Sequence, residues 1–147
     1  MLRRLGLLAA VVCSLALTTG CAVNRATATL SPGTDLSTYK SIYVVKQPKD
    51  KAGIDTMIAD DLRKRGYQVT QGPERTTPYE ADVAVTYIDK WMWDITMYLL
   101  ELTVHIRDAK SGFPVATGNS LHTSLTRKSP PEMVDEVMNN IFTAPKK

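Results

Sequence analysis

Residue types that could carry catalysis are few and scattered in this sequence. His105 and His122 are the only histidines, and both fall on strands predicted below, where we expect ordinary exposed side chains. Glu101 shares a strand face with His105 but is about 13 Å away, too far to share a metal ion. Asp89 and Asp94 flank the tryptophans without an accompanying base or nucleophile. With no HExxH, GxSxG or phosphate-loop motif, we expect no enzyme, metal or cofactor.

Cys21 is the residue whose surroundings predict a chemical modification. A basic start, an apolar run of 13 residues from Leu5 to Leu17 and a small-residue segment ending at Gly20 form a secretory signal peptide. The alternative is an uncleaved membrane anchor, but the run is shorter than the roughly 20 residues that span a bilayer. The segment Leu17-Thr18-Thr19-Gly20-Cys21 resembles the bacterial lipobox, with threonine where leucine is usual. The resemblance implies that residues 1–20 are removed and that Cys21 is lipidated.

The charge balance and the residue after Cys21 bear on location. The chain has 18 Lys and Arg against 15 Asp and Glu, and only Arg3 and Arg4 are charged before Cys21, which leaves 16 against 15. A chain so close to neutral has no electrostatic basis for binding nucleic acid. Ala22 follows the cysteine, and resemblance to enterobacterial lipoproteins then implies the outer membrane, with the domain facing the periplasm. We expect the acyl chains to anchor the protein there.

The segment from Trp91 to Leu100 has the most unusual composition in the chain. It holds both tryptophans, one charge in ten residues, and no glycine or proline, although a strand reversal must fall within it. Two interpretations are open: the aromatic side chains pack against the sheet, or they form an exposed tip for a partner or a membrane. Alternation places Trp91 and Trp93 on one side of their strand, beyond the charge of Asp89. Trp91, Trp93 and Tyr98 are therefore candidate partner-binding residues.

Hydrophobic periodicity predicts five strands and two helices in the order β-α-β-β-β-β-α. We expect strands at 41–45, 67–70, 81–93, 100–108 and 113–125, and helices at 53–65 and from Ser129 to a stop at Ala144-Pro145. Each helix has one apolar stripe, so both should lie on one face of a single mixed sheet, which makes the fold class α+β. Residues 35–142 form the domain, 21–34 a lipidated tether in which 28–30 could add a short edge strand, and 143–147 a tail.

The hairpin between residues 100 and 125 has a predicted register. Setting Leu102 opposite Gly118 and Val104 opposite Ala116 places large residues against small ones on the core face, and a one-residue slip would break this match. The small residues leave room for the last helix. We therefore expect Val137 and Ile141 to be buried against that face.

Three stretches of the chain carry a family resemblance. The segments 35–42 (DLSTYKSI), 62–67 (LRKRGY) and 81–83 (ADV) resemble a group of uncharacterised Gram-negative lipoproteins built on one small α/β domain. The order of elements is also similar to the TolB amino-terminal domain and to LpoB. The resemblance implies envelope adaptors rather than enzymes, and no family active site matches here.

These observations lead to one expected function and one main alternative. We expect an outer-membrane lipoprotein that acts as a non-enzymatic adaptor or accessory in cell-envelope assembly or maintenance, with an envelope protein as partner. The alternative is a small-ligand or lipid carrier with a pocket between sheet and helices, and a hydrolase is third. A cavity lined by Leu102, Val104 and Met138 would favour the carrier. A filled core with exposed Trp91 or Trp93 would favour the adaptor.

Overall fold

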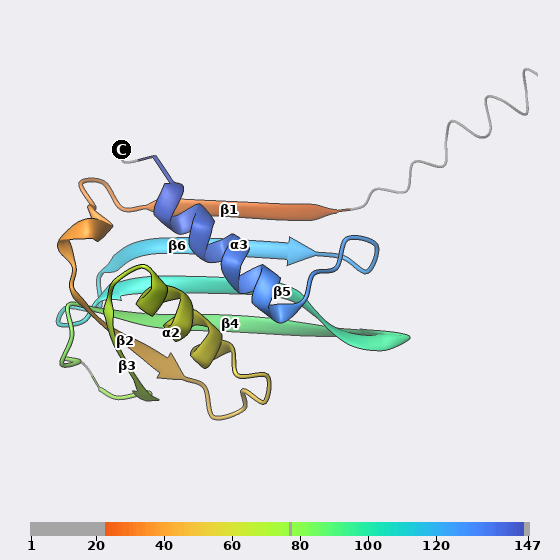
Figure 1. The fold of residues 1–147 in the computed structure, drawn as a ribbon, viewed down its shortest axis with the longest axis horizontal. Helices are drawn as coiled ribbons and strands as arrows, with labels where there is room; N and C mark the ends of the chain where they lie inside the picture. The colour runs from red at the N-terminus through yellow and green to blue at the C-terminus, as the bar shows by residue number, and fades with distance from the viewer. Residues whose placement is uncertain (1–22, 77, 146–147) are drawn as a thin grey trace, which may run out of the picture.

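One six-stranded sheet runs through the molecule, and two helices cover one of its faces (Figure 1). The structure is a computed structural model that describes residues 23–145 apart from residue 77. The strands are β1 (Asn24–Leu30), β2 (Ser41–Lys46), β3 (Gln68–Pro73), β4 (Val83–Asp94), β5 (Thr96–Asp108) and β6 (Pro114–His122). The helices are α2 (Ile54–Lys64) and α3 (Pro130–Thr143), and a single turn, η1, spans Leu36–Thr38. The predicted α+β fold with both helices on one face is confirmed.

The strand order is β1-β6-β5-β4-β2-β3. β2 pairs parallel with both β3 and β4, and the remaining neighbours are antiparallel, so the sheet is mixed. All five predicted strands are present, and α2 makes the expected crossover between β2 and β3. No helix in the described part of the chain is long and apolar enough to cross a bilayer.

Strand β1 corrects the interpretation of residues 21–34 as a tether. It pairs with β6 over its whole length, from Asn24 opposite His122 to Leu30 opposite Ala116, and α3 lies across it. Its small alternating residues give only a weak strand pattern, which we expected at most over 28–30. β1 forms because the backbone N–H and C=O groups at the free edge of β6 need hydrogen-bond partners, and residues 24–30 supply them. The local sequence pattern does not reveal this pairing. The predicted signal peptide and Cys21 lie outside the described residues.

The register of the β5–β6 hairpin differs from the prediction by two residues. Val104 lies opposite Gly118, and Leu102 opposite Ser120. The register changes between Ile106 and Arg107, and the Asp108 carboxylate orders the turn by accepting from two backbone N–H groups there. Because the shift is even, each side chain keeps its face, and large residues still oppose small ones.

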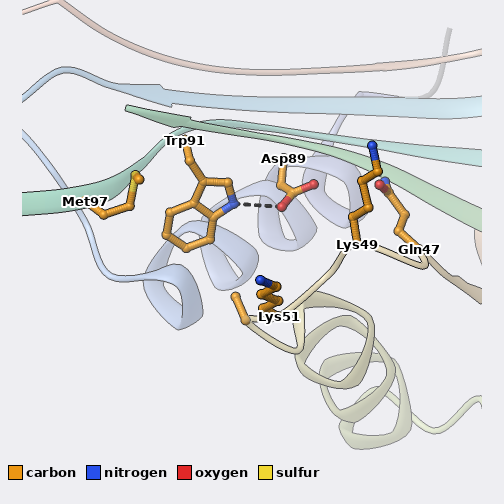
Figure 2. Close-up of a pocket in the computed structure, with 7 residues that line it drawn as sticks. Gln47, Lys49, Lys51, Asp89, Trp91 and Met97 are labelled. Carbon is orange, nitrogen blue, oxygen red and sulfur yellow. Dashed lines mark hydrogen bonds between the residues drawn. The ribbon is translucent and has the colours of Figure 1, made fainter. Parts of the chain in front are cut away.

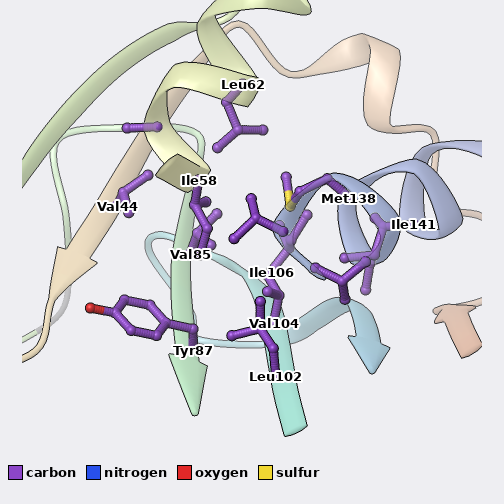
Figure 3. Close-up of a cluster of buried hydrophobic side chains, with 14 of the residues drawn as sticks. Val44, Ile58, Leu62, Val85, Tyr87, Leu102, Val104, Ile106, Met138 and Ile141 are labelled. Atoms are coloured by element: carbon purple, nitrogen blue, oxygen red, sulfur yellow. The ribbon is translucent and has the colours of Figure 1, made fainter. Parts of the chain in front are cut away.

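The core lies between the sheet and the two helices, where apolar side chains from both layers meet (Figure 3). Val137 and Ile141 of α3 are fully buried, as predicted. Gly118 lets α3 approach closely, because a Cβ there would lie 2.7 Å from Ile141 Cγ1 and 2.8 Å from Val137 Cγ2. The small residue on β6 therefore sets the distance between helix and sheet.

Candidate functional site

The β4–β5 hairpin extends beyond the rest of the sheet as a two-stranded arm. The last row shared by four strands contains Arg25, Leu121, Glu101 and Lys90. From Lys90 the chain continues five residues to the turn at Ile95, about 17 Å at the usual rise per strand residue. Figure 1 shows this overhang, and we call residues 91–99 the hairpin arm. A bulge between Lys90 and Trp91 marks its base.

Residues 91–97 of the arm are mainly apolar and exposed, whereas the last two residues of the arm are buried. Trp93 is 68% exposed, Ile95 88%, Met97 59% and Trp91 38%. The inner residues of β4, such as Tyr87, are buried. The inner part of the strand thus belongs to the core and the outer part emerges beyond it, as Asp89 in the sequence suggested.

Tyr98 departs from the prediction that it shares this exposed surface. Its side chain is only 8% exposed, and the guanidinium carbon of Arg127 lies 4.5 Å from the centre of its ring. Arg127 follows β6 and is 29 residues away in sequence, so no local pattern could place it on Tyr98. Tyr98 therefore packs inside the base of the arm and is not part of its exposed surface.

Exposed large hydrophobic side chains concentrate at this one end of the molecule. Nine such residues are exposed in the described chain, and seven of them lie here: Val23, Trp91, Met92, Trp93, Ile95, Met97 and Leu125. Val23 and Leu125 belong to this end because Thr123 N–H, just after β6, donates to the carbonyl oxygen of Val23 (3.3 Å). A surface so concentrated marks an interaction site more often than a scatter of single apolar residues does.

The turn of the arm holds a strained residue. Ile95 has a φ of 59°, in the left-handed region that a β-branched residue rarely adopts. Arg127 holds the turn on both sides, because its guanidinium donates to Thr96 Oγ1 (2.8 Å) and lies 3.5 Å from the Asp94 carboxylate. The surrounding contacts thus enforce a backbone conformation that glycine would adopt without cost.

A pocket of ≈ 580 Å³ lies between the arm and the loop after β2 (Figure 2). Its wall includes Trp91 and Met97 from the arm and Lys49 and Lys51 from the loop. The Trp91 indole N–H donates to the Asp89 carboxylate at 2.7 Å. In the described part of the chain, neither lysine forms an ion pair.

Tyr87 and Asp50 fix this loop beside the arm. The Tyr87 hydroxyl donates to the Asp50 carboxylate (2.7 Å), which also accepts from the backbone N–H groups of Ala52 and Gly53 at the start of α2. Burial disfavours the Asp50 carboxylate, but these hydrogen bonds outweigh it and lower the pKa of Asp50. Burial, and then the hydrogen bond to Asp50, raise the pKa of Tyr87. Sequence patterns missed this connection, since the two residues lie 37 positions apart.

The two histidines lie on opposite faces of the sheet. His105 is partly exposed on the uncovered face, with Nδ1 3.1 Å from Thr117 Oγ1. His122 is buried on the helix face, so the expectation of an exposed side chain is wrong there. The reason is α3, which brings Glu136 to 2.7 Å from His122 Nε2.

Glu136 gathers a polar cluster beneath α3. Ser120 Oγ–H (2.6 Å) and the Lys128 ammonium donate to its carboxylate, as His122 does. Burial disfavours the charged form, but the hydrogen bonds outweigh it and lower the pKa of Glu136 to about 2. Serine and histidine both bind the carboxylate rather than each other and are themselves buried, so this is no nucleophile with its base. No group of three or more potential metal ligands occurs within the described residues.

Comparison with known proteins shows similarity in fold only. No family model and no curated protein matches the chain. Among solved structures, a PelC dodecamer variant from Paraburkholderia phytofirmans superposes with a TM-score of 0.59 and 14% identity, over 84% of this chain and 100% of that one. A second crystal form of the PelC dodecamer from the same organism gives 0.57 and 13%, over 81% and 98%. The resemblance to TolB and LpoB stays a prediction.

Proposed function

We propose that this protein is an outer-membrane lipoprotein facing the periplasm, a non-enzymatic adaptor or accessory in cell-envelope assembly or maintenance that docks through the hairpin arm. The observation that carries the proposal is the collection of exposed apolar side chains at one end of the molecule. The described chain begins at that same end, with Val23 two residues after the predicted lipid site, Cys21. A lipid anchor would therefore hold the apolar end towards the membrane.

The filled core favours this function over a ligand carrier. Leu102, Val104 and Met138, the residues that would have lined an internal cavity, are fully buried in one cluster. The pockets of ≈ 580 and ≈ 550 Å³ lie beside the arm and on the uncovered face of the sheet instead. A carrier of this fold would have to use an open surface pocket rather than the space between sheet and helices.

The anchor is tested by Cys21→Ser. We expect the variant to leave the membrane fraction or to remain unprocessed, because the acyl chains and the cleavage both depend on that thiol. Mass spectrometry of the mature protein reads both outcomes. Cys13→Ser is the matched control, since Cys13 lies in the predicted signal and should have no effect. A Cys21→Ser protein with unchanged mass and membrane retention would contradict the anchor.

The docking role is tested by the double substitution Trp91→Ala with Trp93→Ala. After mild crosslinking in membranes, we expect the wild-type chain to give a defined crosslinked product that the double variant lacks. Exposed aromatic residues dominate binding energy, so their joint loss should abolish docking. Phe113→Ala is the control, because Phe113 is an exposed aromatic residue on the turn between β5 and β6, at the opposite end of β5 from the arm. Equal products from both variants would exclude the arm as the docking surface.

Self-association is a second proposal, which the comparisons favour. Both similar structures are of dodecamers. In this chain, β1 and β3 are the free edges of the sheet, where copies could pair. Sedimentation of the full chain in detergent tests this proposal. We expect a mass of several chains, and a single-chain mass would contradict self-association.

A further inference from the structure

We infer that the tip of the hairpin arm inserts into the lipid surface to which Cys21 anchors the protein. The inference rests on the proposed lipid anchor, and it names what the exposed arm contacts. In this orientation the strands of the sheet run away from the membrane surface, and the tip of the arm points into it. The inserted arm would hold the uncovered face of the sheet in position for a protein partner at the membrane, so loss of the two tryptophans would still abolish the crosslinked product.

Chain lengths allow the tip to reach the lipid surface in that orientation. Ile95 lies five residues beyond the last four-stranded row, whereas Asn24 lies one residue beyond it. The tip therefore projects past Asn24 by about 13 Å along the strand direction. Three residue steps separate Asn24 from Cys21, which is at most about 11 Å of fully extended chain. The tip reaches at least as far as the lipidated residue, even with the connection stretched.

The composition of the tip suits a bilayer interface. Trp93 and Met97 lie opposite each other on the arm, and Ile95 is the most exposed large hydrophobic side chain described. Tryptophan favours the headgroup region, and apolar side chains gain by leaving water. The turn also keeps isoleucine where asparagine or glycine would relieve the strained backbone. An apolar side chain at this exposed position is what membrane insertion requires.

Charges around the arm fit an anionic lipid surface. The only charged residue of the arm, Asp94, is paired with Arg127, so the tip would not carry an unpaired carboxylate into the interface. Lys49 and Lys51 lie on the adjoining loop, set back from the tip, and are exposed. Cations held near an anionic lipid surface are attracted to it. A lipid surface needs no shape-matched partner groups, and the tip offers few polar groups for a protein to recognise.

Tryptophan fluorescence is a specific probe of this contact, because the chain has only two tryptophans and both lie in the arm. The lipidated full chain, purified from membranes, is reconstituted into vesicles of phosphatidylethanolamine and phosphatidylglycerol, with and without brominated acyl chains. We expect blue-shifted emission and roughly twofold or stronger quenching by the brominated lipid. In single-tryptophan variants, Trp93 should be quenched more than Trp91, since it is nearer the tip and more exposed.

The control moves the probe to the opposite end of the molecule. In a Trp91→Phe, Trp93→Phe background, Phe113→Trp places a tryptophan on the exposed turn between β5 and β6. We expect its emission to be unchanged by brominated lipid. Quenching equal to that of the arm would mean unspecific contact with the vesicle and would overturn the inference.

The mass of the same sample separates the two proposals. A lipidated protein whose arm is quenched supports the inference. A lipidated protein whose tryptophans emit as in water overturns it, while the proposed function stands with a protein as the occupant of the arm. A protein without lipid overturns both.

Discussion

Ile95 combines a strained backbone with the position that we propose to contact lipid. Its φ of 59° costs an isoleucine about 1–2 kcal/mol, which asparagine largely avoids. We therefore expect Ile95→Asn to stabilise the domain by about 1 kcal/mol and to raise its melting temperature by a few degrees. The same change should weaken quenching of the arm by brominated lipid, because it removes the apolar tip.

Met97→Asn is the control for this pair of effects. Met97 is exposed on the same arm but has no strained backbone, so the substitution should weaken lipid contact without raising the melting temperature. If Ile95→Asn lowered the melting temperature instead, the isoleucine would be part of the supporting structure and not a strained contact residue.

The carboxylate of Glu136 makes the free energy of unfolding depend on pH in the acid range. Its pKa in the folded domain is about 2, below the ordinary value of 4.5, so its contribution is present above pH 4.5 and is lost as the pH falls towards 2. The shift corresponds to roughly 3 kcal/mol, which solvent screening of this partly exposed carboxylate reduces to a contribution on the order of 1–2 kcal/mol. We expect the free energy of unfolding, measured in denaturant, to fall by about that amount over this range.

Glu136→Gln should remove this part of the pH dependence and lower stability near neutral pH. The amide offers Ser120 and His122 one acceptor oxygen in place of a charged carboxylate. Glu132→Gln is a useful comparison, because Glu132 lies on the same helix with exposed partners. A wild-type slope retained in Glu136→Gln would assign the acid sensitivity to other groups.

At the scale of elements, the contact between α3 and β6 carries much of the domain. Val137 is fully buried over Gly118, and a charge there would have no partner. We expect Val137→Asp to destabilise the domain by several kcal/mol, on the order of the largest effects of single substitutions. Asn139→Asp, on the exposed side of the same helix, should cost less than about 1 kcal/mol. Chemical denaturation compares the two, and similar losses would mean that α3 does not depend on this contact.

At the scale of the whole molecule, residues 91–97 of the arm lie outside the buried core that includes Leu99, so this exposed part should contribute little to the stability of the domain. The double substitution Trp91→Ala with Trp93→Ala removes side chains that lie largely outside the core cluster. We expect the circular dichroism spectrum to be unchanged and the melting temperature to fall by only a few degrees, mainly from the loss of the Trp91 contact with Asp89. A loss of most of the stability would place the tryptophans in the core and would end the docking proposal.

Features that depend on local periodicity could be predicted from the sequence. The stripes of α2 and α3 and the alternation along β4 and β5 belong to contiguous residues, and the structure confirms these elements. The emergence of the arm was also predictable, because Asp89 interrupts an apolar strand face and the strand is much longer than the usual five or six residues. In each case, the signal is carried by residues a few positions apart.

The tertiary structure alone decided which distant segments meet. β1 forms because β6 offers it a free edge, and Tyr98 is covered because a later loop brings Arg127 over its ring. The burial of His122 and the cluster around Glu136 depend in the same way on how α3 lies across the sheet. The observed register of the β5–β6 hairpin differs from the predicted one by two residues. Both registers set large side chains opposite small ones, so this match could not choose between them, and the bulge and the turn geometry did. Side-chain periodicity fixes which face a residue takes, but the packing of complete elements chooses its neighbours.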